Sequence, residues 1–206
     1  MPTDFFLRSA ASGLGGAGQR RLSQRRGRAS ATFITSTTAG GTNIITTATA
    51  GGQALSWFSE PVTEAITISG TITVNIRGLE AANSVNAGRG ILIERCNNAG
   101  VVQSTILVDS TVPATITEYT TTDAANGAAT YTATSTAMAV GERIKVTLKV
   151  RNVGTMGANA SGVTNSHDGP AAGAAGDTWV RFTQDIITDE VLEVGASEIY
   201  GAGIYG

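Results

Sequence analysis

One stretch of the chain alternates apolar and polar residues more regularly than any other. Between Ile66 and Ile76, isoleucine or valine occupies every second position on both sides of Gly70. A repeat of two residues places these side chains on one face of a β-strand and the polar ones on the other. The stretch therefore predicts a strand buried on one side, either kinked at Gly70 or divided there into two short strands.

Further short strands separated by turn residues are predicted along the chain. The clearest is 143–151, and 90–96 with 101–108 predict a hairpin around the turn 97–100. The others are 32–37, 43–49, 54–58, 115–121, 129–135 and 177–185, while 79–87 is the one place where a short helix fits. About ten short strands with threonine-rich faces predict an all-β fold, a jelly-roll β-sandwich, because so long a sheet must close or double over to hide its edges.

Charge and composition divide the chain into three predicted parts. Residues 1–30 hold six arginines and one acid, a net charge of +5, whereas the remainder holds eight basic and fifteen acidic groups, a net charge of -7. We predict an extended basic N-terminal arm at 1–31, the β-sandwich at 32–185 and a C-terminal tail at 186–206. A basic arm on an acidic body indicates that the arm binds something negatively charged.

The predicted arm has too little apolar surface to order itself, so we expect a neighbouring subunit to hold it. Its expected assembly contacts are Phe5, Phe6, Leu7, Arg20, Arg21, Arg25, Arg26 and Arg28. The arginines suit bidentate contacts to carboxylates of a neighbour, such as those of the acidic C-terminal region. Nucleic acid is the less favoured partner, because no aromatic residue lies among these arginines.

Three motifs invite a chemical interpretation. Residues 13–18 satisfy G-x-G-x-x-G, but a dinucleotide site needs a preceding strand and a following helix, so a flexible segment is favoured. Ser166-His167-Asp168 contains the single histidine, yet the members of a catalytic triad converge from separate segments, so we interpret it as an exposed turn. Cys96 is the sole cysteine, which excludes an internal disulfide and indicates a small buried side chain.

No cofactor, metal site or catalytic residue is predicted. The acids near the C-terminus match no metal-binding loop. No window approaches the ~18 consecutive apolar residues of a membrane span, and the N-terminus lacks the apolar core of a signal peptide.

Two resemblances suggest a function. The order Trp57-Phe58-Ser59-Glu60-Pro61, 66–78, 91–95 and 141–146 is similar to jelly-roll domains of the galactose-binding-like type. The combination of an arm, a body rich in Thr, Ala and Gly, and a glycine-tyrosine tail resembles accessory structural proteins of tailed-bacteriophage virions. The resemblance implies a non-enzymatic virion component of the capsid (a decoration or cement protein), neck or tail. Its partners would be other virion proteins and copies of itself.

Two other classes of function stay open. A carbohydrate-binding or host-adhesion module would hold a glycan against an aromatic side chain, but Trp57 and Trp179 lie in strand patterns that favour core packing. Tyr119 and Tyr131 are the other aromatic candidates. A hydrolase would need a carboxylate placed by the fold, and the sequence singles none out.

Overall fold

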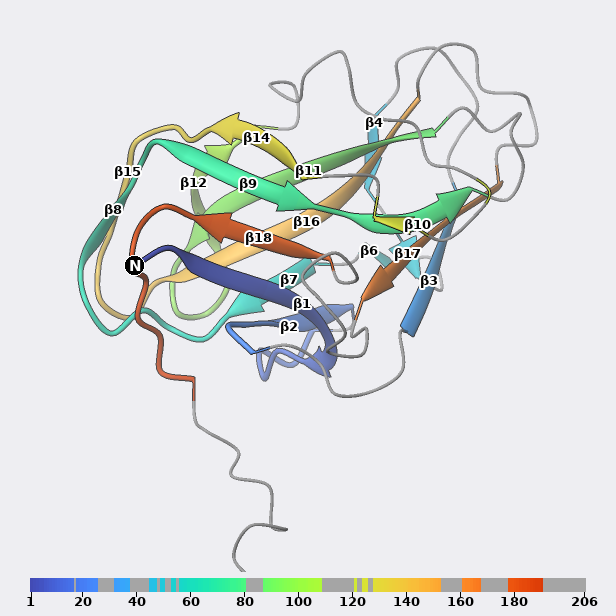
Figure 1. Ribbon diagram of the computed structural model, residues 1–206. Helices are drawn as coiled ribbons and strands as arrows, with labels where there is room; N and C mark the ends of the chain where they lie inside the picture. The colour runs from blue at the N-terminus through green and yellow to red at the C-terminus, as the bar shows by residue number, and fades with distance from the viewer. Residues whose placement is uncertain are drawn as a thin grey trace, which may run out of the picture.

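The computed structural model describes residues 1–16, 18–25, 32–37, 45–47, 49–50, 53–54, 56–80, 87–108, 121, 124–125, 128–152, 161–167 and 178–190. Every regular element within these ranges is a β-strand (Figure 1). The predicted all-β class is therefore confirmed. Within the same ranges, no helix has the length and apolar character needed to span a membrane.

A large sheet contains most of these strands. Its members are β1 (Thr3–Ala11), β2 (Gln19–Ser23), β4 (Ile45–Thr47), β7 (Ser56–Ser59), β9 (Thr71–Asn75), β11 (Ala87–Cys96), β12 (Val102–Leu107), β14 (Ala129–Thr132), β16 (Arg143–Asn152) and β18 (Trp179–Phe182). They follow the order β12-β11-β16-β7-β2-β1-β18-β9-β14, and β4 pairs with β16 as well. The pairing of β2 with β7 is parallel, whereas β1 pairs antiparallel with both β2 and β18.

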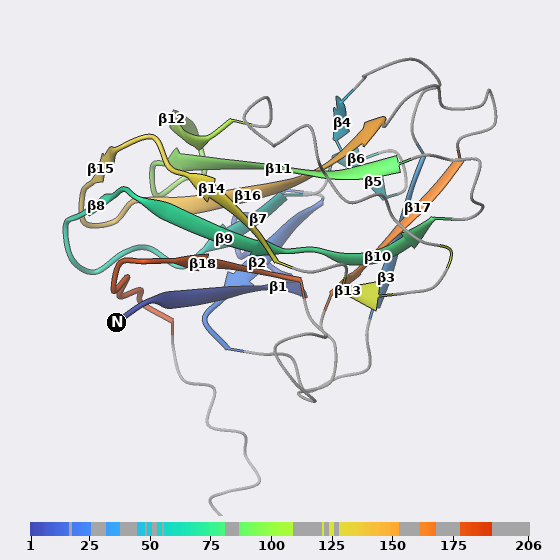
Figure 2. The same ribbon diagram turned by 45° about the horizontal axis from the view of Figure 1, so that its top comes forward.

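The large sheet curls until its two edge strands approach each other (Figure 2). The backbone amide of Thr134, just after β14, donates a hydrogen bond to the carbonyl of Ile106 in β12 at 2.8 Å. The sheet is therefore nearly closed. Closure of this kind protects the unpaired backbone groups of edge strands from pairing with other chains.

Three small sheets complete the described structure. Their strands are β3 (Thr32–Thr37), β5 (Thr49–Ala50), β6 (Gln53–Ala54), β8 (Ile66–Ile68), β10 (Arg77–Glu80), β13 (Ala124–Ala125), β15 (Thr136–Met138) and β17 (Ser161–His167). The sheet β13-β10-β17-β3 lies at one end of the molecule, and the pair β15-β8 lies at the other (Figure 1). The third is the pair β5-β6.

The alternating stretch forms two short strands that are separated by a bend at Gly70. This is the second of the two predicted arrangements. Gly70 has a φ of +73°, in the left-handed region that glycine adopts without steric cost. On one side of it β8 pairs with β15, and on the other β9 lies between β18 and β14. The side chains of Ile68 and Ile72 are both 0% exposed, so the buried face continues across the bend.

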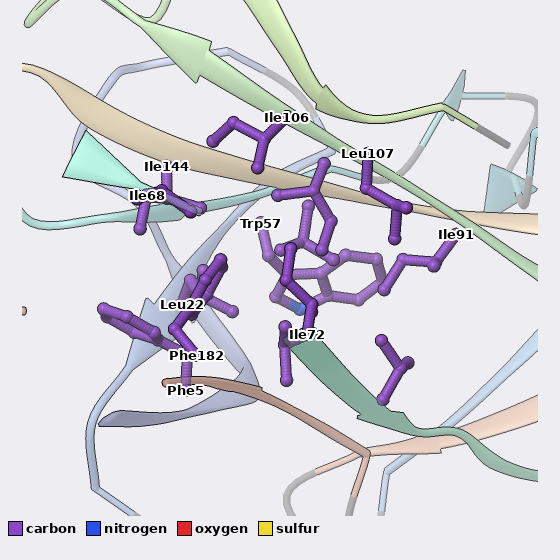
Figure 3. Close-up of a cluster of buried hydrophobic side chains, with 14 of the residues drawn as sticks. Phe5, Leu22, Trp57, Ile68, Ile72, Ile91, Ile106, Leu107, Ile144 and Phe182 are labelled. Carbon is purple, nitrogen blue, oxygen red and sulfur yellow. The ribbon is translucent and has the colours of Figure 1, made fainter. Parts of the chain in front are cut away.

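The core fills the space enclosed by the curled sheet (Figure 3). Trp57 lies among isoleucine and leucine side chains from several strands and is fully buried. Its indole Nε1 donates a hydrogen bond to the carbonyl of Arg8 at 2.9 Å. The rings of Phe5 and Phe182 meet edge to face, with centroids 5.9 Å apart. Side chains from both ends of the chain therefore contribute to one core.

The N-terminal residues differ most from the sequence-based expectation. β1 lies between β2 and β18 inside the large sheet, and Phe5 and Leu7 belong to the core of their own chain. Residues 3–11 and 19–23 consequently form strands of the large sheet and not an extended arm. The prediction failed because the run Phe5-Phe6-Leu7 is buried on both faces, and such a strand shows no alternation.

Two other expectations also need correction. The strand β17, in a region where the sequence predicted none, pairs with both β10 and β3. The predicted helix at 79–87 begins within β10 and ends where β11 starts. The predicted strand 115–121 lies outside the described residues except at its last position.

Candidate functional site

A groove of about 530 Å³ lies beside the start of β1. Volumes of this size accommodate small organic ligands. Its lining residues are Met1, Pro2, Thr3, Asp4, Phe6, Gln24, Asp185, Ile186 and Ile187. The groove therefore combines an apolar wall with two carboxylates and one amide, and we describe it below as the β1 groove.

The alternation of side chains along β1 places the groove on the face opposite the core. Phe5 and Leu7 point into the core cluster, whereas Asp4 and Phe6 line the β1 groove. Successive side chains of a strand point to opposite faces of its sheet, so this division is the one that β1 must have. Phe6 is only 6% exposed, so its side chain forms the floor of the groove and does not project from the surface.

The segment after β18 forms the other wall. The backbone amide of Ile186 donates to Thr3 Oγ1 at 2.8 Å, and Gln24 Nε2 donates to the carbonyl of Ile186 at 2.6 Å. Both bonds join residues more than 160 positions apart in the sequence. The groove therefore exists only where the two ends of the described chain meet.

A serine and a glutamate reinforce this wall. Ser23 Oγ donates a hydrogen bond to Glu190 Oε1, and the backbone amide of Gln24 donates to Glu190 Oε2 at 2.8 Å. Ser23 is 4% exposed and also accepts a hydrogen bond from the amide of Arg25 at 3.0 Å. The Ser23 hydroxyl thus both donates and accepts a hydrogen bond within the chain. It holds Glu190 in place and does not face a ligand.

The two carboxylates of the β1 groove have different partners. Asp4 accepts two hydrogen bonds from Arg181, at 2.6 Å from Nε and 2.8 Å from Nη2, and these raise the pKa of Arg181. The guanidinium also lies over the ring of Trp179, 5.1 Å from its centroid. Asp185 instead lies 3.1 Å from the α-amino group of Met1, with 60% of its side chain exposed. Asp4 is therefore neutralised within the fold, whereas Asp185 faces an exposed ammonium.

The expected assembly contacts occupy several places in the structure. Phe5, Phe6 and Leu7 are buried within their own chain. Arg20 and Arg21 lie on β2, where Arg21 Nε is 3.6 Å from Glu60 Oε1. Arg25 accepts a hydrogen bond at its carbonyl from Arg8 Nη1 at 3.2 Å. Arg26 and Arg28 lie outside the described residues, and an assembly role for the arginines stays a prediction.

The two short motifs carry no ligand site in the described part of the chain. Residues 13–18 lie between the antiparallel strands β1 and β2, so a strand precedes this loop, but a second strand follows it in place of the helix that a dinucleotide site requires. Ser166 and His167 are consecutive residues of the strand β17 and not of the turn predicted for them. Asp168 lies outside the described residues.

The aromatic residues considered as contacts for a glycan are mostly buried where the structure describes them. Trp57 is fully buried, as its strand pattern indicated, and Trp179 is 7% exposed. Tyr131 packs in part against the core, and Tyr119 is not among the described residues. Among those residues, no three His, Cys, Asp or Glu side chains are grouped as a metal site would require.

Cys96 behaves as a buried apolar side chain, as predicted. It is 0% exposed, and burial raises the pKa of its thiol to about 11, an effect that the nearby Lys145 ammonium partly offsets. The neutral thiol is the form that is neither nucleophilic nor metal-binding. Cys96 is therefore not a nucleophile at neutral pH.

The raised pKa of Cys96 predicts a loss of stability at alkaline pH. Between pH 9.0 and about 11, the thiol of the unfolded chain loses its proton before that of the folded chain, so the unfolded state is favoured as the pH rises. Below pH 9.0 both thiols are neutral and contribute no difference. Urea unfolding at a series of pH values should show a smaller decline in the Cys96→Ala variant, and identical declines in both proteins would contradict the assignment.

Comparison with known proteins gives a match in fold only. No sequence family matches the chain, and no curated protein matches it. An aminopeptidase from a marine sediment Thaumarchaeota archaeon matches 91% of this chain and 37% of its own, with a TM-score of 0.55 and 12% identity. An α-amino acid ester hydrolase matches 87% of this chain and 36% of its own, with a TM-score of 0.51 and 10% identity.

These matches contradict the expected virion component and the expected absence of enzymatic function. Both proteins that share the fold are hydrolases, and by name neither is a virion, carbohydrate-binding or adhesion protein. The expected partners and the location in a virion stay untested predictions. The chain spans just over a third of the length of the hydrolases it matches, and what is established is that it has the all-β fold of one part of such hydrolases.

Proposed function

We propose that this chain is the β domain of a hydrolase that acts on a substrate with a free α-amino group. The observation that carries the proposal is the pair of structural matches, which cover about nine tenths of this chain and just over a third of each hydrolase. By their names, an aminopeptidase and an α-amino acid ester hydrolase both act on α-amino acid derivatives. The bond cleaved here would be an aminoacyl ester or an N-terminal peptide bond.

The geometry of the described residues agrees with a role beside a catalytic centre. The Ser23 hydroxyl, which is hydrogen-bonded to a carboxylate, is buried and both donates and accepts a hydrogen bond within the chain. The thiol of Cys96 is neutral. Neither side chain is therefore placed as a nucleophile. The β1 groove, in contrast, is open and has a carboxylate beside apolar side chains. The chain would therefore contribute substrate contacts and support. The jelly-roll winding expected from the sequence belongs to this proposal, supported by the largely antiparallel pairing of the nearly closed sheet.

The test is to purify the protein from the cells that produce it, under conditions that preserve any complex. Fractions are assayed for hydrolysis of L-leucine methyl ester and of L-leucine p-nitroanilide, with the N-acetylated substrates as controls. Activity that follows the chain through two chromatographic steps, is removed with it by a specific antibody and requires the free amine would support the proposal. A purified complex of the chain with its partner that hydrolyses neither substrate, or activity that remains after the chain has been removed, would overturn it.

A further inference from the structure

We infer that this chain docks against the remainder of the hydrolase through one end of its large sheet. The inference rests on the proposed function, because it names the surface that contacts the part of the hydrolase outside this chain. Segments that lie outside the named strands form this end, and we call it the apolar end. They are residues 60–65, 97–101, 139–142 and 183–190.

Strand directions bring these segments together. β7 and β11 both pair antiparallel with β16, so the last residues of β7 and β11 lie beside the first residue of β16, at the end of the molecule where Figure 1 shows the pair β15-β8. The amide of Val62 donates to the carbonyl of Glu142 at 2.8 Å, and the next amide donates to the carbonyl of Ile187 at 3.0 Å. Arg143 Nε donates to the carbonyl of Asn98 at 3.0 Å. The segments therefore form one connected surface.

Exposed aliphatic side chains gather at the apolar end. Val101 is 57% exposed, Val140 is 63% exposed and Ile187 is 48% exposed. Val102, the first residue of β12, is 40% exposed. In the described chain beyond residue 1, the one other exposed large hydrophobic side chain is Val108, which lies past the opposite end of β12. Single exposed hydrophobic side chains are common, but a group of them is typical of a surface that contacts another protein or domain.

The charges at the apolar end describe its partner. The four segments contain six carboxylates and no lysine or arginine. Some of these carboxylates are paired within the chain, as Glu60 is with Arg143 at 3.2 Å, but Glu64 and Asp189 are exposed. Two copies of this chain joined through the apolar end would bring like charges together. A surface with an apolar centre and basic residues at its edge would complement it.

The partner with a reason to cover this surface is the remainder of the hydrolase. This chain covers just over a third of each hydrolase of the same fold, so most of each polypeptide lies outside the matched part. A domain of a larger protein contacts the rest of it, and covering exposed apolar side chains stabilises that contact. Ile187 also lines the β1 groove. Docking at the apolar end therefore places the groove beside the remainder of the hydrolase, where substrate contacts are required.

Photochemical cross-linking identifies what covers the apolar end. The photoreactive residue p-benzoylphenylalanine replaces Val140 in the cells that produce the protein, and in a second variant it replaces Val108 as the matched exposed valine. After irradiation, the protein is purified with its hydrolase activity, and cross-linked peptides are identified by mass spectrometry. Position 140 is expected to cross-link to hydrolase sequence outside residues 1–206, and position 108 is not. The expectation is the same for a separate chain and for a continuation of the same polypeptide.

A charged substitution tests the contact by a second measurement. In the active protein, Val140→Asp should raise amide hydrogen exchange in 97–101 and 139–142 by about tenfold or more, because an interface then opens that must bury an unpaired carboxylate. Val108→Asp should leave the exchange of both segments unchanged. Urea unfolding of the chain without its partner should be the same for the two variants, since both valines are exposed.

Three results would overturn the inference. They are cross-links from position 140 to another copy of this chain, cross-links from it to a protein without hydrolase activity, and equal cross-linking from positions 140 and 108. Hydrolase activity that follows the chain while position 140 gives no cross-link would also overturn the inference, but it would leave the hydrolase proposal standing. The assays of activity described above test that proposal separately.

Discussion

Replacing Phe5 with alanine is expected to lower the free energy of unfolding by about 3–5 kcal/mol. Phe5 is 0% exposed, and its ring meets that of Phe182 edge to face at 5.9 Å. The variant loses the transfer free energy of the ring and leaves a cavity that the surrounding strands cannot fully close. Urea unfolding followed by tryptophan fluorescence measures the difference.

The Phe5 experiment decides whether the N-terminal residues are a strand or an arm. Val140→Ala is the control, because Val140 is 63% exposed and such a change is expected to cost within about 0.5 kcal/mol. An arm that contacted only a neighbouring subunit would leave the stability of the isolated chain unchanged when Phe5 is truncated. A Phe5→Ala variant as stable as Val140→Ala would therefore contradict the position of β1 in the sheet.

Replacing Arg143 with methionine is expected to cost about 2–4 kcal/mol, the second largest effect. Its Nη1 donates to the carbonyl of Ser59 at 2.7 Å and to Glu60 Oε2 at 3.2 Å, and its Nε donates to the carbonyl of Asn98 at 3.0 Å. The side chain is 11% exposed. Methionine keeps much of the aliphatic volume but donates no hydrogen bond, so these acceptors lose a partner where water reaches them poorly.

Arg181→Met is the matched control, since it also removes an arginine bonded to a carboxylate. The Arg181 side chain is 45% exposed, and exposed ion pairs contribute about 0–1 kcal/mol. Urea unfolding of the two variants under the same conditions should therefore rank Arg143→Met well below Arg181→Met in stability. Equal losses would mean that Arg143 is not held as a buried link between β7, the turn 97–100 and β16.

The structure shows how far local sequence could predict this fold. The alternation in β16 predicted its buried face, and Ile144, Val146 and Leu148 are at most 2% exposed. The turn 97–100 was predicted from its residues, and the amide of Gly100 donates to the carbonyl of Asn97 at 2.9 Å with a φ of +81° at the glycine. These features depend on residues close in sequence, which is why their pattern could be recognised.

The β1 groove could not be predicted in this way. Asp4 was counted as a single acid in a basic arm, and Asp185 as one of several acids near the C-terminus, so no pattern joined them. Both are placed beside one groove by the pairing of β1 with β18, in which Asp4 is opposite Arg181. Phe6, predicted to anchor an arm, is the floor of the groove.

The sequence by itself determined that the chain forms short, half-buried β-strands, where Gly70 and the turn 97–100 redirect it, and that Cys96 is a buried side chain. Those properties follow from the repeat of two residues and from the conformational range of glycine, which are local. The tertiary structure decided that β1 and β2 belong to the large sheet, that the sheet nearly closes and that the β1 groove exists. Strand pairing decides these because a strand's pattern specifies which face is buried but not which strand is its partner. The partners here are as far apart in the sequence as Thr3 and Phe182.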